Sequence, residues 1–416
     1  MREGNLEMRR ADRDRLKVIH EVMKGHLTQA AGGGHLGISE RQVRRLTRRV
    51  REEGDAGVLH RGRGRSSNRR IPEKTLERIR KELKRPEWSD FGPTYAQEQL
   101  RQLGYEVGRE TVRKLQIELG LRQARRRREI HRERRVRREC FGELVQMDTS
   151  IHNWLEGRGE EELVLVGMID DAGSRMRARF YRGDTSLANL DLLRRWTQEF
   201  GRPVSLYVDK ASHFKVNRPR WRLEEELEDR TPQTQIERAM GELGTEVIWA
   251  NSPEAKGRVE RLFGTLQDRL VKGMRLKGIC RLEEANRYLE EEFLPEWESR
   301  WTVQAKSGVD AHRPVYRGMD LLSIFSVREE RTVKRDYTVQ WKNRTFQITK
   351  QAHPGGLRGG KVEVERRVDG TLTLRFKAGY LEFVEIEARS SGRRRPAPEL
   401  KGAAKAQPLQ GEEWSL

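Results

Sequence analysis

Hydrophobic residues follow different spacings along the 416-residue chain, and these spacings divide it into regions. Spacings of three and four residues predict helices within 12–56 and again within 72–121. Residues 142–300 combine short apolar runs, typical of buried strands, with helical stripes. Residues 327–388 alternate between apolar and polar positions, which predicts antiparallel strands joined by turns such as Asp369-Gly370. We therefore expect a multidomain protein with two helical units, a mixed α/β core and a small antiparallel β-barrel.

The first helical unit, residues 12–56, has the layout of a helix-turn-helix domain. Thr28 and Ser39 are placed to cap its second and third helices, and Gly37 lies in the turn before the third. Gly32-Gly33-Gly34 weakens the second helix, because each glycine costs on the order of 1 kcal/mol relative to alanine. We expect the third helix to be a recognition helix, although a solvated arginine-rich helix would have the same composition. Its candidate DNA contacts are Arg41, Arg44, Arg45 and Arg48.

A second helix-turn-helix unit is expected at residues 72–121. Pro72 suits the first turn of one helix, and a second helix should start near Pro93. The glycine-flanked segment 104–108 then makes the turn before the last helix. That helix supplies the candidate DNA contacts Arg109, Arg113 and Lys114.

A basic segment follows each helical unit. Residues 60–70, rich in glycine, serine and arginine, are expected to be a flexible linker. Residues 122–141 form an arginine-rich linker, with ten arginines among the seventeen positions 122–138. Because like charges repel, we expect this linker to become ordered only on a polyanion, or to act as a solvated tether. Its candidate DNA contacts are Arg125, Arg126, Arg127 and Arg128.

The pattern in residues 142–300 predicts a mixed five-stranded sheet flanked by helices. The predicted order is strand, two hairpin strands, helix, strand, helix, strand and long helix. These elements are expected at 144–148, 163–169, 176–181, 185–200, 204–208, 234–243, 246–250 and 253–275.

Three acidic residues hold distinctive positions in this core. Asp148 ends the first strand, Asp209 ends the fourth, and Glu260 lies on the last long helix. Two carboxylates at strand ends and a third on a helix can hold two divalent metals about 3.5–4 Å apart, which act on a phosphodiester by activating a hydroxyl and stabilising the leaving oxygen. The three residues are therefore candidate catalytic and metal-binding residues.

Other polar residues near these acids have simpler explanations. Lys210, Lys256 and Arg261 border the acids and could bind phosphates, or could be ordinary surface charges. Asp170-Asp171 is assigned to a hairpin turn. The nine histidines show no ligand spacing, so zinc chemistry is poorly supported.

Charge and composition narrow the class of partner. The chain has 85 lysines and arginines against 65 acids, a net charge of +20, which suits a polyanion. No apolar stretch of 18 residues or more could span a bilayer, so DNA is favoured over a membrane. No signal-peptide core follows the first residues, and two distant cysteines fit a reducing cytoplasm. A solubilising surface or a ribosome-associated protein would also explain the charge.

The chain resembles the insertion-sequence transposases of the retroviral-integrase (DDE) superfamily, in the bacterial group with an N-terminal helix-turn-helix. The resemblance covers most of the chain and is carried by residues 142–148 with 150, 152 and 154, by 206–210, and by 252–261 continuing to 270. It implies a ribonuclease H-like catalytic core, dependence on two Mg²⁺ ions (with Mn²⁺ as a substitute), and a homo-oligomer acting on terminal inverted repeats and target DNA. It also implies that Asp148, Asp209 and Glu260 form the metal-binding triad.

The C-terminal region is expected to be an SH3-like barrel at 327–388, followed by a disordered tail at 389–416. The chain departs from the family at Thr149, Glu254 and the glycine triplet. Two other functions stay open at this point. One is a non-catalytic DNA-binding regulator derived from a transposase, and the other is a metal-dependent nuclease that cuts without joining.

Overall fold

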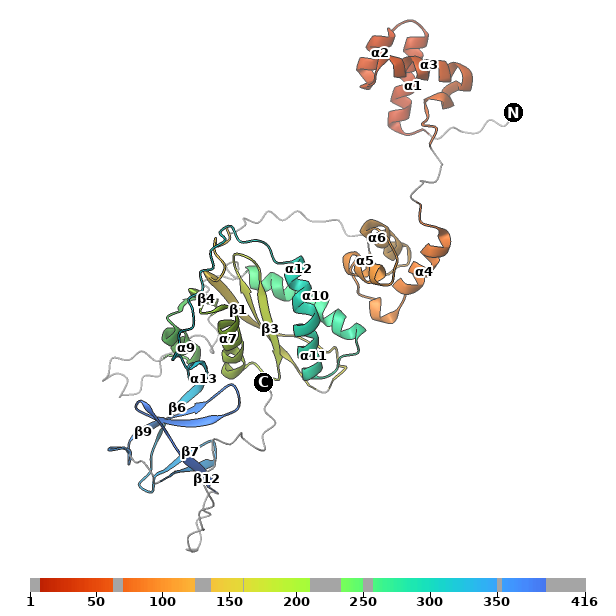
Figure 1. The fold of residues 1–416 in the computed structure, drawn as a ribbon. Coiled ribbons are helices and arrows are strands. Elements are labelled where there is room, and N and C mark those ends of the chain that lie inside the picture. Colours follow the sequence, from red (N-terminus) through yellow and green to blue (C-terminus); the bar gives the residue numbers. More distant parts are fainter. Residues whose placement is uncertain are drawn as a thin grey trace. The chain divides into compact units, whose positions relative to one another are not determined.

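A computed structural model describes residues 8–62, 70–123, 136–159, 161–209, 233–249, 257–349 and 354–386. The chain divides into two compact units, residues 1–82 and 83–416. Figure 1 shows the three-helix domain of the first unit, and the sheet and its helices in the second.

The first unit folds as the predicted three-helix domain. Its helices are α1 (Arg10–Met23), α2 (Gln29–Leu36) and α3 (Glu40–Glu53), followed by the 3-10 turn η1 (Gly54–Val58). The core is made by Ile19, Val43, Leu46, Val50 and Val58.

Turn and cap residues set the ends of these helices. The Thr28 hydroxyl accepts a hydrogen bond from the Ala31 backbone N–H at 3.1 Å, which confirms the predicted cap of α2. Gly37 takes a left-handed φ of 65° at the end of α2. Ser39 occupies the N-cap position of α3, although its side chain makes no capping bond.

The glycine triplet of α2 has a packing explanation. A Cβ on Gly32 would lie 2.8 Å from the Val22 side chain, and one on Gly33 would lie 2.7 Å from the Ile38 backbone oxygen. Gly34 has open space around its Cα. Two of the three glycines therefore let α2 approach α1 and the start of α3 closely, at the cost of intrinsic helix propensity.

Alanine substitutions should separate the effect of glycine on close helix packing from its effect on helix propensity. Gly33→Ala is expected to destabilise the first unit, because overpacking costs about 1–3 kcal/mol and the gain in helix propensity returns only about 1 kcal/mol. The matched variant Gly34→Ala should stabilise it by up to about 1 kcal/mol. Hydrogen exchange of α1–α3 in the full chain measures both effects. A stabilising Gly33→Ala would contradict the close approach of α2 to Ile38.

The next helices begin where the sequence predicts. They are α4 (Glu73–Leu83), η2 (Pro86–Trp88), α5 (Pro93–Gln102) and α6 (Arg109–Glu118). In the second unit, Glu98 of α5 accepts hydrogen bonds from Arg269 at 2.5 and 3.1 Å and is also paired with Arg300. Burial alone would raise the pKa of Glu98, but the hydrogen bonds from these two arginines lower it.

The predicted mixed five-stranded sheet is confirmed. Its strands are β1 (Leu144–Ile151), β2 (Val164–Asp170), β3 (Met176–Tyr181), β4 (Ser205–Val208) and β5 (Glu246–Trp249), in the order β3-β2-β1-β4-β5. The first three strands are antiparallel, and β4 pairs in parallel with both β1 and β5. One boundary was predicted wrongly: β1 does not stop at Asp148, because Thr149, Ser150 and Ile151 continue its ladder with β2.

Helices cover both faces of this sheet (Figure 1). Against one face lie α7 (Ser186–Phe200) and α9 (Gln235–Leu243), which pack on alternate residues of β1 and β4 such as Met147 and Val208. Against the other lie α10 (Gly257–Leu276), α11 (Leu282–Tyr288), the π-helical η4 (Leu289–Phe293) and α12 (Leu294–Arg300). The sequence pattern did not predict the last three.

The C-terminal strands do not confirm a closed barrel. After α13 (Leu321–Ile324) the strands are β6 (Val327–Thr332), β7 (Thr338–Trp341), β8 (Arg344–Ile348), β9 (Lys361–Arg366), β10 (Leu372–Phe376), β11 (Gly379–Leu381) and β12 (Phe383–Ile386). Within the described residues they form two separate antiparallel sheets, β11-β10-β9-β6 and β12-β8-β7. The two sheets share one apolar core, which stabilises the domain without closing a ring of strands. The expected disordered tail lies outside the described residues.

Candidate active site

The register of the sheet places Asp148 and Asp209 at the same level. The parallel ladder between β1 and β4 pairs Leu144 with Ser205 and Gln146 with Tyr207. Continued by two residues, this register sets Asp148 opposite Asp209, which directly follows β4. Because paired residues of adjacent strands point to the same side of a sheet, the two carboxylates share one face. Both residues are half-buried.

That shared face is the one covered by α10. On β1, Val145 and Met147 pack against the α7 side, so Asp148 points the other way. The residues two before and two after it confirm this direction. Gln146 accepts a hydrogen bond from the Val259 backbone N–H at 3.3 Å, and Ser150 accepts one from the Gln267 side chain at 3.1 Å.

Glu260 lies in the first turn of the helix that covers this face. One helical turn later, Phe263 packs over Gly167, the β2 residue that pairs with Asp148. A Cβ on Gly167 would lie 3.2 Å from the Phe263 ring, so glycine here allows α10 to lie close to the sheet beside Asp148. Val259 is fully buried and Glu260 is exposed, which puts Glu260 at the border of the packed face.

The donor set suits a hard cation, although it is not gathered into one cluster. Three carboxylates are the oxygen ligands that Mg²⁺ prefers. Among the residues that the structure describes, no three Asp, Glu, His or Cys side chains are placed to hold a metal ion. The extended β1–β4 register would set Asp148 opposite Asp209, whereas Glu260 is related to Asp148 through the packing of α10 on the sheet.

The candidate DNA contacts differ in how they are engaged. The Arg44 side chain donates hydrogen bonds to Gln29 at 3.1 Å and to Glu40 at 2.8 Å, and Arg113 is paired with Glu110 on its own helix. The exposed side chains among the described candidates are Arg41, Arg44, Arg45, Arg48, Arg109, Lys114 and Arg261. The remaining candidates lie outside the described residues: Arg125, Arg126, Arg127, Arg128, Lys210 and Lys256.

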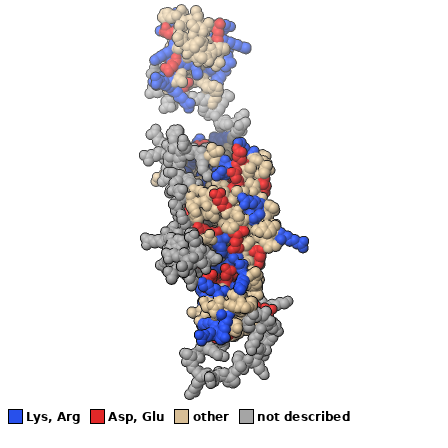
Figure 2. All heavy atoms as spheres, turned by 90° about the vertical axis from the view of Figure 1, so that its left-hand side faces the viewer, with Lys and Arg blue, Asp and Glu red and all other residues tan. Residues whose placement is uncertain are grey.

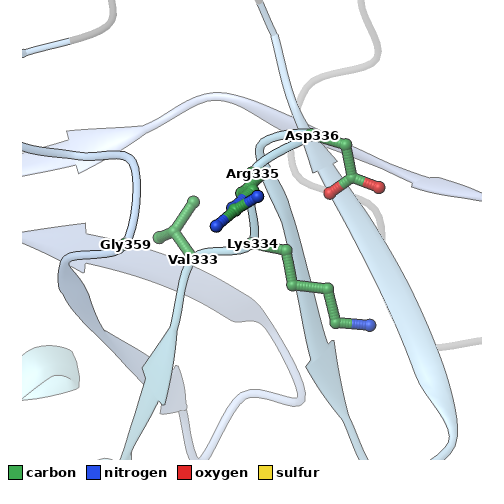
Figure 3. A pocket seen from close by; sticks show the side chains of 5 residues that line it. All are labelled: Val333, Lys334, Arg335, Asp336 and Gly359. Atoms are coloured by element: carbon green, nitrogen blue, oxygen red, sulfur yellow. The ribbon is translucent and has the colours of Figure 1, made fainter.

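Basic and acidic side chains are also mixed on the molecular surface. On the face shown in Figure 2, basic and acidic side chains are interspersed over the described part of the molecule. A separate pocket lies in the C-terminal strands and is lined by Val333, Lys334, Arg335, Asp336 and Gly359 (Figure 3). None of its lining residues belongs to the five-stranded sheet or to α10.

The assignment of Asp170-Asp171 to a simple hairpin turn is incomplete, because both side chains are fully buried. Asp170 accepts backbone hydrogen bonds from Gly142 at 3.0 Å and from Gly173 at 2.5 Å, and burial raises its pKa. Asp171 is paired with Arg258 at 2.6 Å. In the sequence, only the position of the pair at a strand end signalled this, since the partners of the two side chains include the distant residues Gly142 and Arg258.

Solved structures with similar parts come from retroviruses. One is the simian T-cell lymphotropic virus intasome in complex with the PP2A regulatory subunit B56 gamma, with 12% identity, 71% of this chain and 96% of that chain covered, and a TM-score of 0.32. Another is the HTLV-2 integrase catalytic core domain in complex with magnesium, with 14% identity, 40% of this chain and 93% of that chain covered, and a TM-score of 0.28.

No helix in the described part of the chain is both long and apolar enough to cross a bilayer.

Sequence relatives identify the family. Residues 14–67 match a helix-turn-helix domain model. The Sinorhizobium fredii protein y4bF, named as a transposase, is 35% identical over 382 residues, which cover 91% of this chain and 82% of that protein. The transposase for insertion sequence IS1202 of Streptococcus pneumoniae is 27% identical over 445 residues, covering 96% and 92%. The chain therefore belongs to the transposases, and it carries a helix-turn-helix domain near its N-terminus.

Proposed function

We propose that this transposase binds the terminal inverted repeats of an insertion sequence and carries out metal-dependent phosphodiester hydrolysis and strand transfer. The catalytic residues in this proposal are Asp148, Asp209 and Glu260. The observation that supports it most is the β1–β4 register, which ends at Gln146 opposite Tyr207 and, extended by two residues, would set Asp148 opposite Asp209. The core would then be a ribonuclease H-like domain at residues 142–300.

In this proposal, each of the three carboxylates would be a metal ligand. Asp148 and Asp209 would hold one Mg²⁺ ion, and Asp148 and Glu260 the other. Bound there, two such ions would lower the pKa of the attacking hydroxyl and stabilise the leaving oxygen. When water attacks, the strand is nicked, and when a DNA 3′-hydroxyl attacks, two strands are joined. No covalent protein–DNA intermediate is required, so no serine or tyrosine nucleophile is assigned.

The helical units supply DNA binding in the same proposal. The exposed arginines of α3 and the basic residues of α6 would contact the element ends, and the linker 122–141 would follow the phosphate backbone. Each phosphate contact adds to the salt dependence of binding, because counterions are released. A homo-oligomer would bring the two ends and the target together in the bacterial cytoplasm, on the nucleoid.

A joining assay on labelled element ends tests this function against its alternatives. With Mg²⁺ or Mn²⁺, the full chain is expected to nick the ends and transfer them to a target plasmid, and no product should form in EDTA. Cut ends that are never joined would show a nuclease. DNA that is bound but stays intact with either metal would show a regulator. Inverted repeats found beside the gene would provide the substrate sequences.

A further inference from the structure

The buried carboxylate of Asp171 connects three segments of the catalytic domain. It lies immediately after β2, and its side chain is fully buried. One oxygen, Oδ1, accepts hydrogen bonds from Arg258 Nε at 2.6 Å and from Gln146 Nε2 at 3.1 Å. The other, Oδ2, accepts one from the Arg138 backbone N–H at 2.8 Å. One side chain therefore contacts β1, the first turn of α10 and the end of the arginine-rich segment.

Gln146 extends this contact to the next residue of α10. Its side-chain NH₂ donates to Asp171, while its Oε1 accepts from the Val259 backbone N–H at 3.3 Å. Arg258 and Val259, the two residues directly before Glu260, are thus both held by this network. Gln146 is itself fully buried and lies two residues before Asp148 on the same face of β1.

We propose that Asp171 is a positioning residue that fixes the first turn of α10, and with it Glu260, relative to Asp148. The inference rests on the proposed function, since it concerns the third carboxylate of that site. Glu260 is exposed and lies in the first turn of its helix. The Arg258 side chain is only 11% exposed and the Asp171 side chain 0% exposed, so solvent screens their attraction little.

The same carboxylate also anchors the end of the segment that leads from the DNA-binding units. Arg138 donates its backbone N–H to Asp171, and the neighbouring Arg137 donates its side chain to the Ala172 carbonyl at 2.9 Å and to Ser174 Oγ at 2.8 Å. The turn after β2 thus holds the end of the linker and the start of α10 together. Loss of this contact should therefore displace Glu260 and weaken metal binding, because groups that orient metal ligands control metal affinity.

The variant Asp171→Asn tests this role in the full chain. It removes the charge that holds Arg258 but keeps a carbonyl acceptor for Arg138. We expect the dissociation constant for Mn²⁺, titrated by electron paramagnetic resonance, to rise about 10–100-fold. Hydrogen exchange should become faster in residues 257–263. With labelled DNA ends, kcat should fall while KM and DNA affinity stay unchanged.

Asp191→Asn is the matched control. Asp191 is equally buried, pairs with Arg194 at 2.9 Å and Arg195 at 2.8 Å, and belongs to α7 on the opposite face of the sheet. It should lower stability without changing Mn²⁺ affinity or the exchange of residues 257–263. Arg258→Lys provides a second test if Asp171→Asn does not fold, because it keeps the charge and loses the guanidinium geometry. It should also weaken Mn²⁺ binding.

Two results would overturn the inference in distinguishable ways. The positioning role would be wrong if Asp171→Asn keeps wild-type Mn²⁺ affinity and wild-type hydrogen exchange. If Asp171→Asn is unfolded, the same result in Arg258→Lys would count against it. The wild-type chain would still be an active transposase in either case. A wild-type chain that neither binds Mn²⁺ nor joins DNA ends would instead defeat the proposed function, and the inference with it.

Discussion

Asp148→Asn is expected to abolish cleavage and joining of DNA ends while leaving DNA binding intact. Asparagine is close to aspartate in size but lacks the charge that would hold both metal ions. Losing several kcal/mol of transition-state stabilisation corresponds to a rate loss of about 10³-fold or more. Single-turnover cleavage of labelled ends, together with a gel-shift measurement of DNA affinity, measures the two effects separately.

The control for this variant lies on the covering helix. Asp268 is exposed on α10, where it pairs with Lys272 one turn later. Asp268→Asn removes the same charge from the same domain and is expected to keep full activity, because Asp268 is not one of the proposed metal ligands. The buried Lys272 keeps Asp90 as a second partner at 3.9 Å. Full strand transfer by Asp148→Asn would contradict the assignment of the triad. Equal loss in both variants would point to a general effect of charge on DNA binding.

The sheet and its first two carboxylates could be predicted from local patterns. An apolar run that ends in an aspartate indicates a buried strand and a polar group at its end, and this reasoning located both Asp148 and Asp209. Whether they converge depends on the parallel register between β1 and β4, which no local pattern predicts. The end of β1 was misjudged because the apolar run stops before Asp148, whereas Thr149, Ser150 and Ile151 continue the ladder with β2.

Contacts between residues far apart in the sequence explain the features that the sequence pattern did not predict. Asp171 looked like a turn residue because its partner Arg258 is 87 residues away. The glycine triplet looked like a weakness of α2 because the side chain and carbonyl that demand glycine belong to other segments. The single barrel expected at the C-terminus resolved into two sheets, since alternation predicts strands without predicting which of them pair.

A similar long-range contact makes Gly142 the most sensitive glycine near the site. It precedes β1, has a φ of +82°, and donates its N–H to the buried Asp170 at 3.0 Å. A Cβ at this position would lie 2.2 Å from His312 Nδ1. His312 cannot easily move, because its Nδ1 lies 2.7 Å from Asp310 and its Nε2 accepts a hydrogen bond from Trp196 at 3.0 Å.

Gly142→Ala is therefore expected to lower the free energy of unfolding of the second unit by about 2–5 kcal/mol. Left-handed backbone costs an alanine about 1–2 kcal/mol, and overpacking against the histidine ring adds about 1–3 kcal/mol. Urea denaturation monitored by tryptophan fluorescence is a direct measurement, because Trp196 donates a hydrogen bond to the displaced ring.

Gly157→Ala isolates the backbone contribution to this loss. Gly157 has a φ of +75° and no atom within 4 Å of an added Cβ. Gly157→Ala should therefore lower the free energy of unfolding only by the backbone cost of about 1–2 kcal/mol. The difference between the two variants then measures the contact with His312. Equal destabilisation by both would mean that the histidine ring moves aside freely. The glycine before β1 would then be required for its backbone conformation alone, and not to bring the strand that carries Asp148 against the His312 side chain.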